Sequence, residues 1–357
     1  MNMNIRKTAL TAGLLVSVMM VSAQGTSAPY EPGVTKDAVS YWLPKTTLTV
    51  TVKAQKQTFK PGEFSRYAER YLRLNNVRDK AEEVWSIESV DITPKGTPDK
   101  EQLYTLTFPS KGNRPYMELT DDGIIQAVNV HIEKPAIRQS LAPSQKAGRK
   151  VNPQEYMTEE ILMAGSTAKM AELTAKEIYN IRESRNAITR GQADFVPTDG
   201  ESLKFMLESL TAQENALLTL FNGTEETEHI TFTVNVTPDS PVAKQILLRF
   251  SSKLGILPVD NLAGEPVWID ITDRQMTAGY GEDTKKQPSK PNAFLYYRIP
   301  GRASVRIYNN RLTLFEDEIQ IAQFGKVEVV STTIMGKNAD TKITFDTTTG
   351  NIKGINE

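Results

Sequence analysis

The 357-residue chain contains no cysteine and only two histidines, His131 and His229. Without cysteine it cannot form disulfides, thiolate nucleophiles or cysteine-ligated metal sites. The histidines lie far apart in the sequence, and neither has the His-x-x-x-His or Glu-x-x-His spacing of a metal site. The sequence also lacks a Gly-x-Ser-x-Gly elbow, a Walker loop and a paired-glycine dinucleotide motif. We therefore predict no metal site and no cofactor.

Strong net charge and long apolar runs are also missing. The formal net charge is -1, which favours neither nucleic acid nor an anionic membrane as a partner. The longest apolar run covers residues 9–21, and a membrane-spanning helix needs about 20 apolar residues. We therefore predict no transmembrane segment in the mature chain and no nucleic-acid partner.

The N-terminus has the pattern of a secretory signal. Arg6 and Lys7 precede the apolar run, and Val21, Ser22 and Ala23 supply the small residues of a cleavage site. A short membrane anchor is the alternative, but the run is too short to span a bilayer. We expect cleavage after Ala23 and export to the periplasm or the outer cell surface.

Two amphipathic helices are predicted over residues 152–223. The first begins at Asn152 with Pro153 at its first position, the second begins in a capping box at 198–201, and Gly223 ends it. Apolar residues spaced three and four apart predict a long antiparallel helical hairpin, with an alanine-rich stripe packed on a leucine-rich one. The first stripe comprises Met157, Ile161, Ala164, Ala168, Ala171, Ala175 and Ile178, and the second Leu203, Leu207, Leu210, Leu217 and Phe221.

Strand patterns lie on both sides of these helices. Residues 47–53 and 230–236 alternate with a period of two, and short extended runs at 84–92 and 103–108 resemble them. The predicted fold class is α+β and mainly β, with two β-rich modules, each a sandwich or partly open barrel, flanking the hairpin. The predicted boundaries are a signal peptide (1–23), a tether (24–40), an N-terminal module with one helix (41–133), a linker (134–151), the hairpin (152–223) and a C-terminal module (224–357).

Several short motifs resemble a known family. They are Tyr41-Trp42-Leu43-Pro44-Lys45-Thr46, Pro61-Gly62, Tyr67-Ala68-Glu69-Arg70-Tyr71-Leu72, Tyr297-Arg298-Ile299-Pro300, Gln323-Phe324-Gly325, Phe345-Asp346 and Thr349-Gly350. They look like those of exported Gram-negative proteins of gut-anaerobe type and similar length, catalogued as a domain of unknown function. The resemblance implies export and a shared fold, and it carries no known activity, substrate or catalytic residue.

Two sets of residues are candidates for a site. Acidic pairs could serve acid–base chemistry if two carboxylates met across a cleft, although carboxylates in turns and edge strands are usually solvated. Aromatic residues could stack on a sugar or peptide ligand, although aromatics on strands are commonly core or cross-strand pairs. The acidic candidates are Asp121, Asp122, Asp270 and Asp273, and the aromatic candidates are Trp268, Tyr280, Tyr296 and Tyr297.

Together these observations favour a non-catalytic binding or structural component of the cell envelope, with an envelope protein or a glycan as partner. The alternative is a carboxylate-dependent hydrolase of envelope or glycan substrates. A third hypothesis, an assembly subunit, would require an exposed apolar patch or an unpaired sheet edge.

Overall fold

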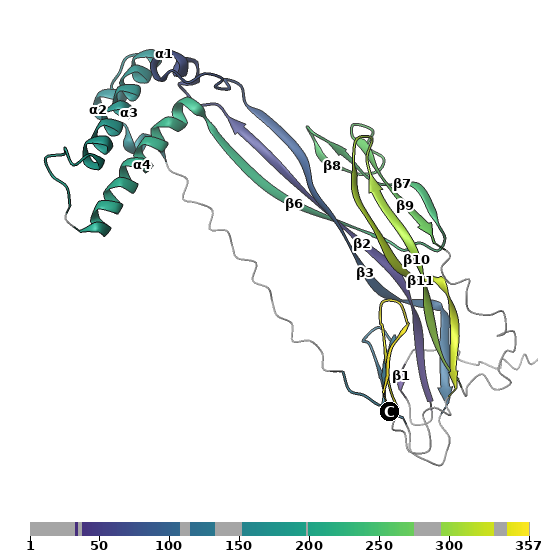
Figure 1. Ribbon diagram of the computed structural model, residues 1–357. Helices are drawn as coiled ribbons and strands as arrows, with labels where there is room; N and C mark the ends of the chain where they lie inside the picture. Colours follow the sequence, from purple (N-terminus) through teal and green to yellow (C-terminus); the bar gives the residue numbers. More distant parts are fainter. Residues whose placement is uncertain are drawn as a thin grey trace, which may run out of the picture.

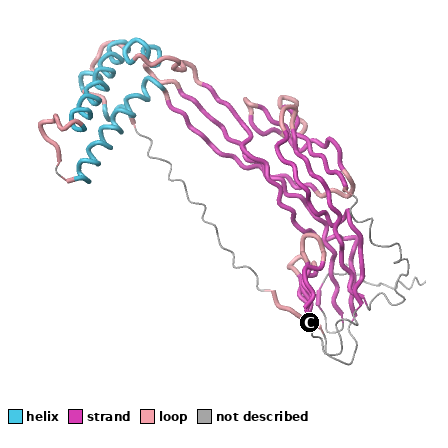
Figure 2. The backbone as a smooth tube through the Cα atoms, in the orientation of Figure 1, coloured by secondary structure: helices cyan, strands magenta, loops and turns pink. Residues whose placement is uncertain are grey.

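The computed structural model describes residues 33–34, 38–107, 115–132, 152–197, 199–274, 294–331 and 341–356. The molecule is elongated, with a β body at one end and a helical head at the other (Figures 1 and 2). The predicted α+β, mainly β class is confirmed by the element order. The predicted signal peptide, the linker 134–151 and Tyr280 lie outside the described residues.

One long sheet runs through the molecule. Its central strand, β2 (Ala38–Lys60), pairs with β3 (Glu82–Thr107) on one side, and with β1 (Gly33–Val34) and β6 (Thr224–Val236) on the other. All the pairings are antiparallel. Beyond the body, β2, β3 and β6 continue to the head over residues 53–60, 82–89 and 224–231, which we call the ribbon.

Charge supports the strand pairing of the ribbon. Its middle strand carries Lys53, Lys56 and Lys60, and both outer strands are acidic. Cross-strand ion pairs follow, Lys56 with Glu83 at 3.1 Å and Lys60 with Glu226 at 3.9 Å. Because both faces of the ribbon are largely exposed, such opposite-charge pairs favour this register.

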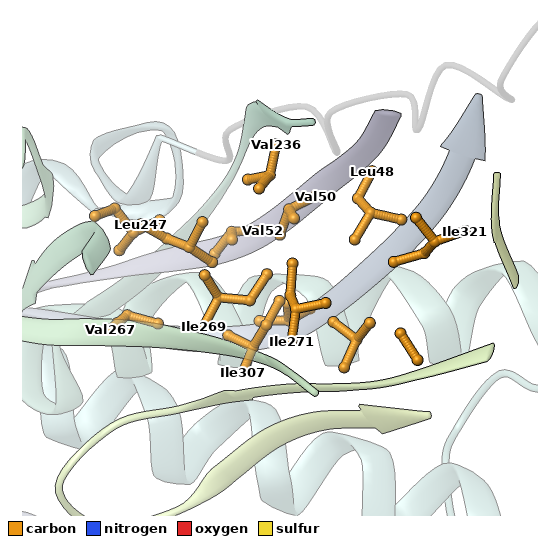
Figure 3. Packing of buried hydrophobic residues seen from close by; sticks show 14 residues of the cluster. Leu48, Val50, Val52, Val236, Leu247, Val267, Ile269, Ile271, Ile307 and Ile321 are labelled. Carbon is orange, nitrogen blue, oxygen red and sulfur yellow. The ribbon is translucent and has the colours of Figure 1, made fainter. Parts of the chain in front are cut away.

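A five-stranded antiparallel sheet packs on the body half of β2, β3 and β6. Its strand order is β11 (Thr313–Ser331), β10 (Phe294–Tyr308), β9 (Glu265–Asp273), β7 (Val242–Ser251) and β8 (Gly255–Leu257). The largest core cluster lies between the two sheets (Figure 3). Val50 and Val52 of β2 meet Ile269 and Ile307 there, all at most 1% exposed.

A small sheet closes the far end of the body in the order β13 (Ile352–Asn356), β12 (Lys342–Phe345), β5 (Ile125–Val128) and β4 (Met117–Leu119). Here β5 from the N-terminal β-rich segment pairs with β12 from the C-terminal one. Likewise β6 pairs with β2 along thirteen residues without a register shift. The two β-rich segments therefore share their sheets, and the head lies at one end of the molecule rather than between two modules. The prediction of two separate β-rich modules flanking the helices is therefore wrong. Strand periodicity identifies the buried face of a strand but not the strand with which it pairs.

The head is built from two helices and three shorter helical turns. The helices are α3 (Thr167–Thr189) and α4 (Gly200–Asn222), and the turns are η1 with α1 (Ser65–Tyr67, Ala68–Leu72), η2 (Pro153–Tyr156) and α2 (Glu159–Leu162). One apolar core joins them, with Ala171, Ala175 and Ile178 of α3 against Leu217 and Phe221 of α4. Phe64, Ala68 and Leu72 complete that core from the segment after β2.

The helix predicted to begin at Asn152 is interrupted twice. Asn152 accepts a hydrogen bond from the Gln154 amide, but only one 3₁₀ turn follows. Thr158 then caps α2, and Ser166 caps α3. Each capping side chain offers the backbone an alternative to continuing the helix, so three starts replace the single one expected. Gly223 ends α4 with φ +81°, as predicted.

None of the helices in the described part of the chain combines the length and apolar composition needed to cross a membrane.

Candidate ligand pocket between ribbon and body

The aromatic candidates do not form one site. Trp268 on β9 faces Tyr308 across the strand pair, with ring centroids 5.6 Å apart. Tyr296 stacks on Tyr104 with centroids 4.1 Å apart, and Tyr297 packs beside the core near the small sheet. Since Tyr296 and Tyr308 are twelve residues apart on β10, roughly 40 Å of strand separates these groups. Both are cross-strand or core pairs.

The acidic candidates are also dispersed. Asp121 and Asp122 are exposed in the turn between β4 and β5. Asp270 and Asp273 lie three residues apart on β9 and therefore point to opposite faces of the sheet.

Asp270 is held by its neighbours. Its carboxylate accepts hydrogen bonds from the Lys244 amide at 2.7 Å, Arg306 Nη2 at 3.1 Å and the Tyr308 hydroxyl at 3.3 Å. Desolvation works to raise the pKa of Asp270, but these hydrogen bonds outweigh it and hold the pKa below its ordinary value. Asp270 is thus an ionised member of a surface network.

Several residues that carry the family resemblance meet at a junction inside the body. Gln323 accepts a hydrogen bond from the Thr46 amide at 2.8 Å and donates to the Thr46 carbonyl at 3.0 Å. The Arg298 guanidinium donates to Asp99, and the Arg298 amide donates to the Gly350 carbonyl. Because these contacts are internal and join three sheets, we assign them a structural role.

A pocket of about 430 Å³ lies at the corner where the ribbon leaves the body, and we call it the corner pocket. Its apolar walls come from β3, β7, the β10–β11 turn and the start of β11: Trp85, Ile87, Phe250, Leu312 and Leu314. Its polar rim comes from β3, the end of β7 with the β7–β8 turn, β9 and the β10–β11 turn, and its residues are Ser86, Ser251, Ser252, Glu265, Asn309 and Arg311.

Trp85 is positioned by the backbone around it. Its amide donates to the Ser252 carbonyl at 2.8 Å, which fastens β3 to the β7–β8 turn. The indole lies against Gly255, where φ is +79° and an added Cβ would come within 2.9 Å of the ring. Only glycine both adopts that backbone and lets the indole approach so closely. The half-buried ring thus has a fixed orientation at the pocket.

The rim is also locally braced. The Asn309 side chain accepts hydrogen bonds from the amides of Arg311 and Leu312 at 2.9 and 2.8 Å, which shapes the β10–β11 turn. Arg249 donates to the carbonyls of Val259 and Gly264 and so fixes the loop on the other side of the rim.

The charges of the corner pocket balance. Glu265 and Arg311 form the one opposite-charge pair of its rim, at 3.5 Å, and both are exposed. The pocket combines a flat aromatic surface, aliphatic walls and several hydrogen-bonding groups, a composition typical of small-molecule sites. Among the described residues, no group of three or more histidine or carboxylate side chains is placed to hold a metal ion.

Sequence reasoning did not find this pocket. Trp85 lies in a predicted strand, and nothing in its neighbourhood distinguishes it from a core residue. The other lining residues are up to 229 positions away, because Leu314 is the last of them. The sequence features nearest to a signal are turn residues such as Asn309 and Gly255. They predict where the chain turns, but not which turns lie next to each other in the fold.

One comparison with known proteins gives a match. A family model described as a domain of unknown function (DUF4831) matches residues 37–353. No curated protein and no solved structure matches the chain.

Proposed function

The chain belongs to the DUF4831 family, a domain of unknown function, and we propose that it is a non-catalytic binding component of the cell envelope that takes a neutral saccharide in the corner pocket. The observation that carries the proposal is the half-buried Trp85 ring beside a rim of hydroxyl, amide and paired charged groups.

The ligand class follows from the pocket's chemistry. A sugar ring has an apolar C–H face that stacks on an aromatic ring and an edge of hydroxyls that needs both donors and acceptors. Trp85 and Phe250 suit the face, and the serines with Asn309 suit the edge. Because Glu265 and Arg311 neutralise each other, the rim favours an uncharged ligand.

A hydrolase is the weaker alternative. Glycoside hydrolysis uses two carboxyl groups roughly 5 to 9.5 Å apart across the bond. Of the described residues that line the corner pocket, Glu265 alone carries a carboxylate, and it is paired with Arg311. A binding function therefore fits the pocket better.

The envelope location rests on the sequence. The basic residues, the short apolar run and the small residues of positions 6–23 support export.

Binding should be measured on purified protein with an array of neutral oligosaccharides, followed by titration calorimetry with any hit. We expect Trp85→Ala to weaken binding about tenfold or more, since an aromatic contact of this kind contributes on the order of 1 kcal/mol beyond its buried area. Arg311→Gln, at an exposed side chain, should weaken it without affecting folding.

Trp268→Ala is the matched control, because Trp268 alternates with the core residues Val267 and Ile269 and so faces away from the body core. The Trp268→Ala variant should bind the saccharide with the same affinity as the wild type. An array without any hit, or equal losses for the Trp85 and Trp268 variants, would refute the proposal.

A further inference from the structure

Helix α4 extends beyond the end of α3. The Glu214 carboxylate is bound by Arg182 and Arg185, each at 2.6 Å. Helix α3 ends at Thr189, one turn beyond Arg185. On the antiparallel α4, Leu210 lies one turn before Glu214 and so is level with the end of α3. Residues 200–209 of α4 therefore project past α3, over about 15 Å at 1.5 Å per residue. This projecting segment forms the part of the head farthest from the ribbon (Figure 1).

The face of α4 that packs on α3 continues along the projecting segment. Leu217 and Phe221 are fully buried in the head core. Leu210, Leu207 and Leu203 extend that stripe at spacings of three and four residues. Leu203 and Leu207 are half-buried and line a shallow groove of about 560 Å³, whose small neighbours include Gly200 and Ala212.

We propose that the projecting segment of a second copy of this chain packs antiparallel on this stripe, forming a head-to-head dimer. The continuity of the stripe with the α3–α4 contact argues for a helix as its occupant, because helical spacing is matched by helical spacing. A two-fold axis at the level of Phe205 places Leu203 of each copy opposite Leu207 of the other. Such a contact is isologous and closes on itself.

The dimensions suit a second copy. Each projecting segment is ten residues long, so two of them overlap fully before either meets the other copy's α3. The exposed Lys204 and Glu208 are 3.8 Å apart within each helix, so these two charges beside the stripe offset each other. The contact is small, and we expect a dimer that dissociates on dilution.

The test is sedimentation equilibrium of the full chain from low micromolar to several hundred micromolar concentration. Leu203→Lys and Leu207→Lys should each weaken dimerisation about tenfold or more, because each change places two charges in one apolar contact. Phe205→Lys is the matched control. Phe205 is 74% exposed, and its helical position places it opposite the stripe, so this variant should dimerise like the wild type.

The absence of native cysteine allows a second measurement. Lys204→Cys lies near the proposed axis and should cross-link two chains with a short bismaleimide, whereas Lys176→Cys on the exposed side of α3 should not. Thermal melts establish that all the variants are folded. A chain that stays monomeric throughout the range, or a dimer lost equally in the Phe205 variant, would overturn the proposal. A dimer of heads can form whether or not the corner pocket binds saccharide, so the two proposals fail independently.

Discussion

At the scale of single residues, the buried charges of the body junction have the largest expected energetic effect. Arg298 and Asp99 are 6% and 3% exposed, and Lys45 lies 3.8 Å from the same carboxylate. Two donors of Arg298, Nε and Nη1, have no hydrogen-bond partner within the described structure. The pair therefore contributes less than its short contact suggests, while either charge left alone would be costly.

Arg298→Met should lower the free energy of unfolding by up to about 3–5 kcal/mol, because the buried Asp99 would keep only Lys45, 3.8 Å away, as a cationic partner. The double variant Arg298→Met with Asp99→Leu should recover much of that loss. Urea unfolding measures both.

Arg274→Met provides the control for the Arg298 variant. Arg274 forms an exposed pair with Glu318, with both side chains about half accessible, and its loss should cost at most about 1 kcal/mol. Equal effects of the Arg274 and Arg298 variants would contradict the assignment of the junction as the critical pair.

Asp346 gives the fold a dependence on acid. Partial burial works to raise the pKa of Asp346, but the amides of Thr348 and Thr349 and the Lys353 ammonium outweigh it and lower the pKa. Because the folded pKa is below that of the unfolded chain, the stabilisation is present above the unfolded value of about 3.9 and is lost as pH falls through the folded value.

Asp346→Asn should therefore reduce stability at neutral pH and flatten its decline between about pH 5 and pH 2. Urea midpoints measured across that range check the prediction. Stability curves for wild type and variant that run parallel would show that Asp346 contributes nothing to the acid sensitivity.

At the scale of elements, glycines determine how the head joins the ribbon. Gly62 follows β2, and a Cβ there would lie 2.2 Å from the Leu220 carbonyl oxygen of α4. The Phe64 amide donates to that same oxygen at 2.7 Å. The chain thus leaves β2 in direct contact with the last turns of α4.

Gly62→Ala should destabilise this joint by about 1–3 kcal/mol, because backbone must move to admit the methyl group. Hydrogen exchange of the amides near Leu220 should accelerate, while strands of the body keep their protection. Gly165→Ala, where a Cβ meets nothing within 4 Å, should leave exchange unchanged. Uniform acceleration across the body would indicate a different cause.

The sequence predicted the presence of helices and strands better than their lengths or the elements against which they pack. It predicted separate strands at 84–92 and 103–108, but β3 continues through Pro94 and Pro98. Proline is tolerated because β3 is an edge strand that pairs, in the described structure, with β2 alone. The sequence predicted one helix in the N-terminal module, but it did not predict that this helix packs in the head core, since α3 and α4 are more than 90 residues further along the chain.

The candidate site was not predictable in the same way. Trp268, Tyr296 and Tyr297 are close in sequence, but Trp268 pairs across strands with Tyr308, Tyr296 stacks on Tyr104 of another sheet, and Tyr297 packs beside the core. Trp85 belongs to a pocket assembled from four separate segments. Local pattern carries no information on that assembly, because the segments meet only through tertiary contacts such as the hydrogen bond from the Trp85 amide to the Ser252 carbonyl.

At the scale of the whole molecule, body and head have separate apolar cores joined by the exposed ribbon. A compact chain of this length would have a radius of gyration of about 20 Å. Small-angle X-ray scattering extrapolated to infinite dilution, where any dimer dissociates, should give a clearly larger value. A value near 20 Å would mean that the head folds back on the body.

The uninterrupted pairing of β6 with β2 makes the ribbon a spacer of set length. Over residues 53–60 it separates the two cores by roughly 25 Å, at about 3.3 Å per residue. Since side chains alternate between faces, inserting one residue per strand between Trp85 and the head would reverse the faces of the strand ends that enter the head, whereas inserting two would preserve every face. The reach of the head can therefore change only in steps of about 7 Å, made in all three strands together.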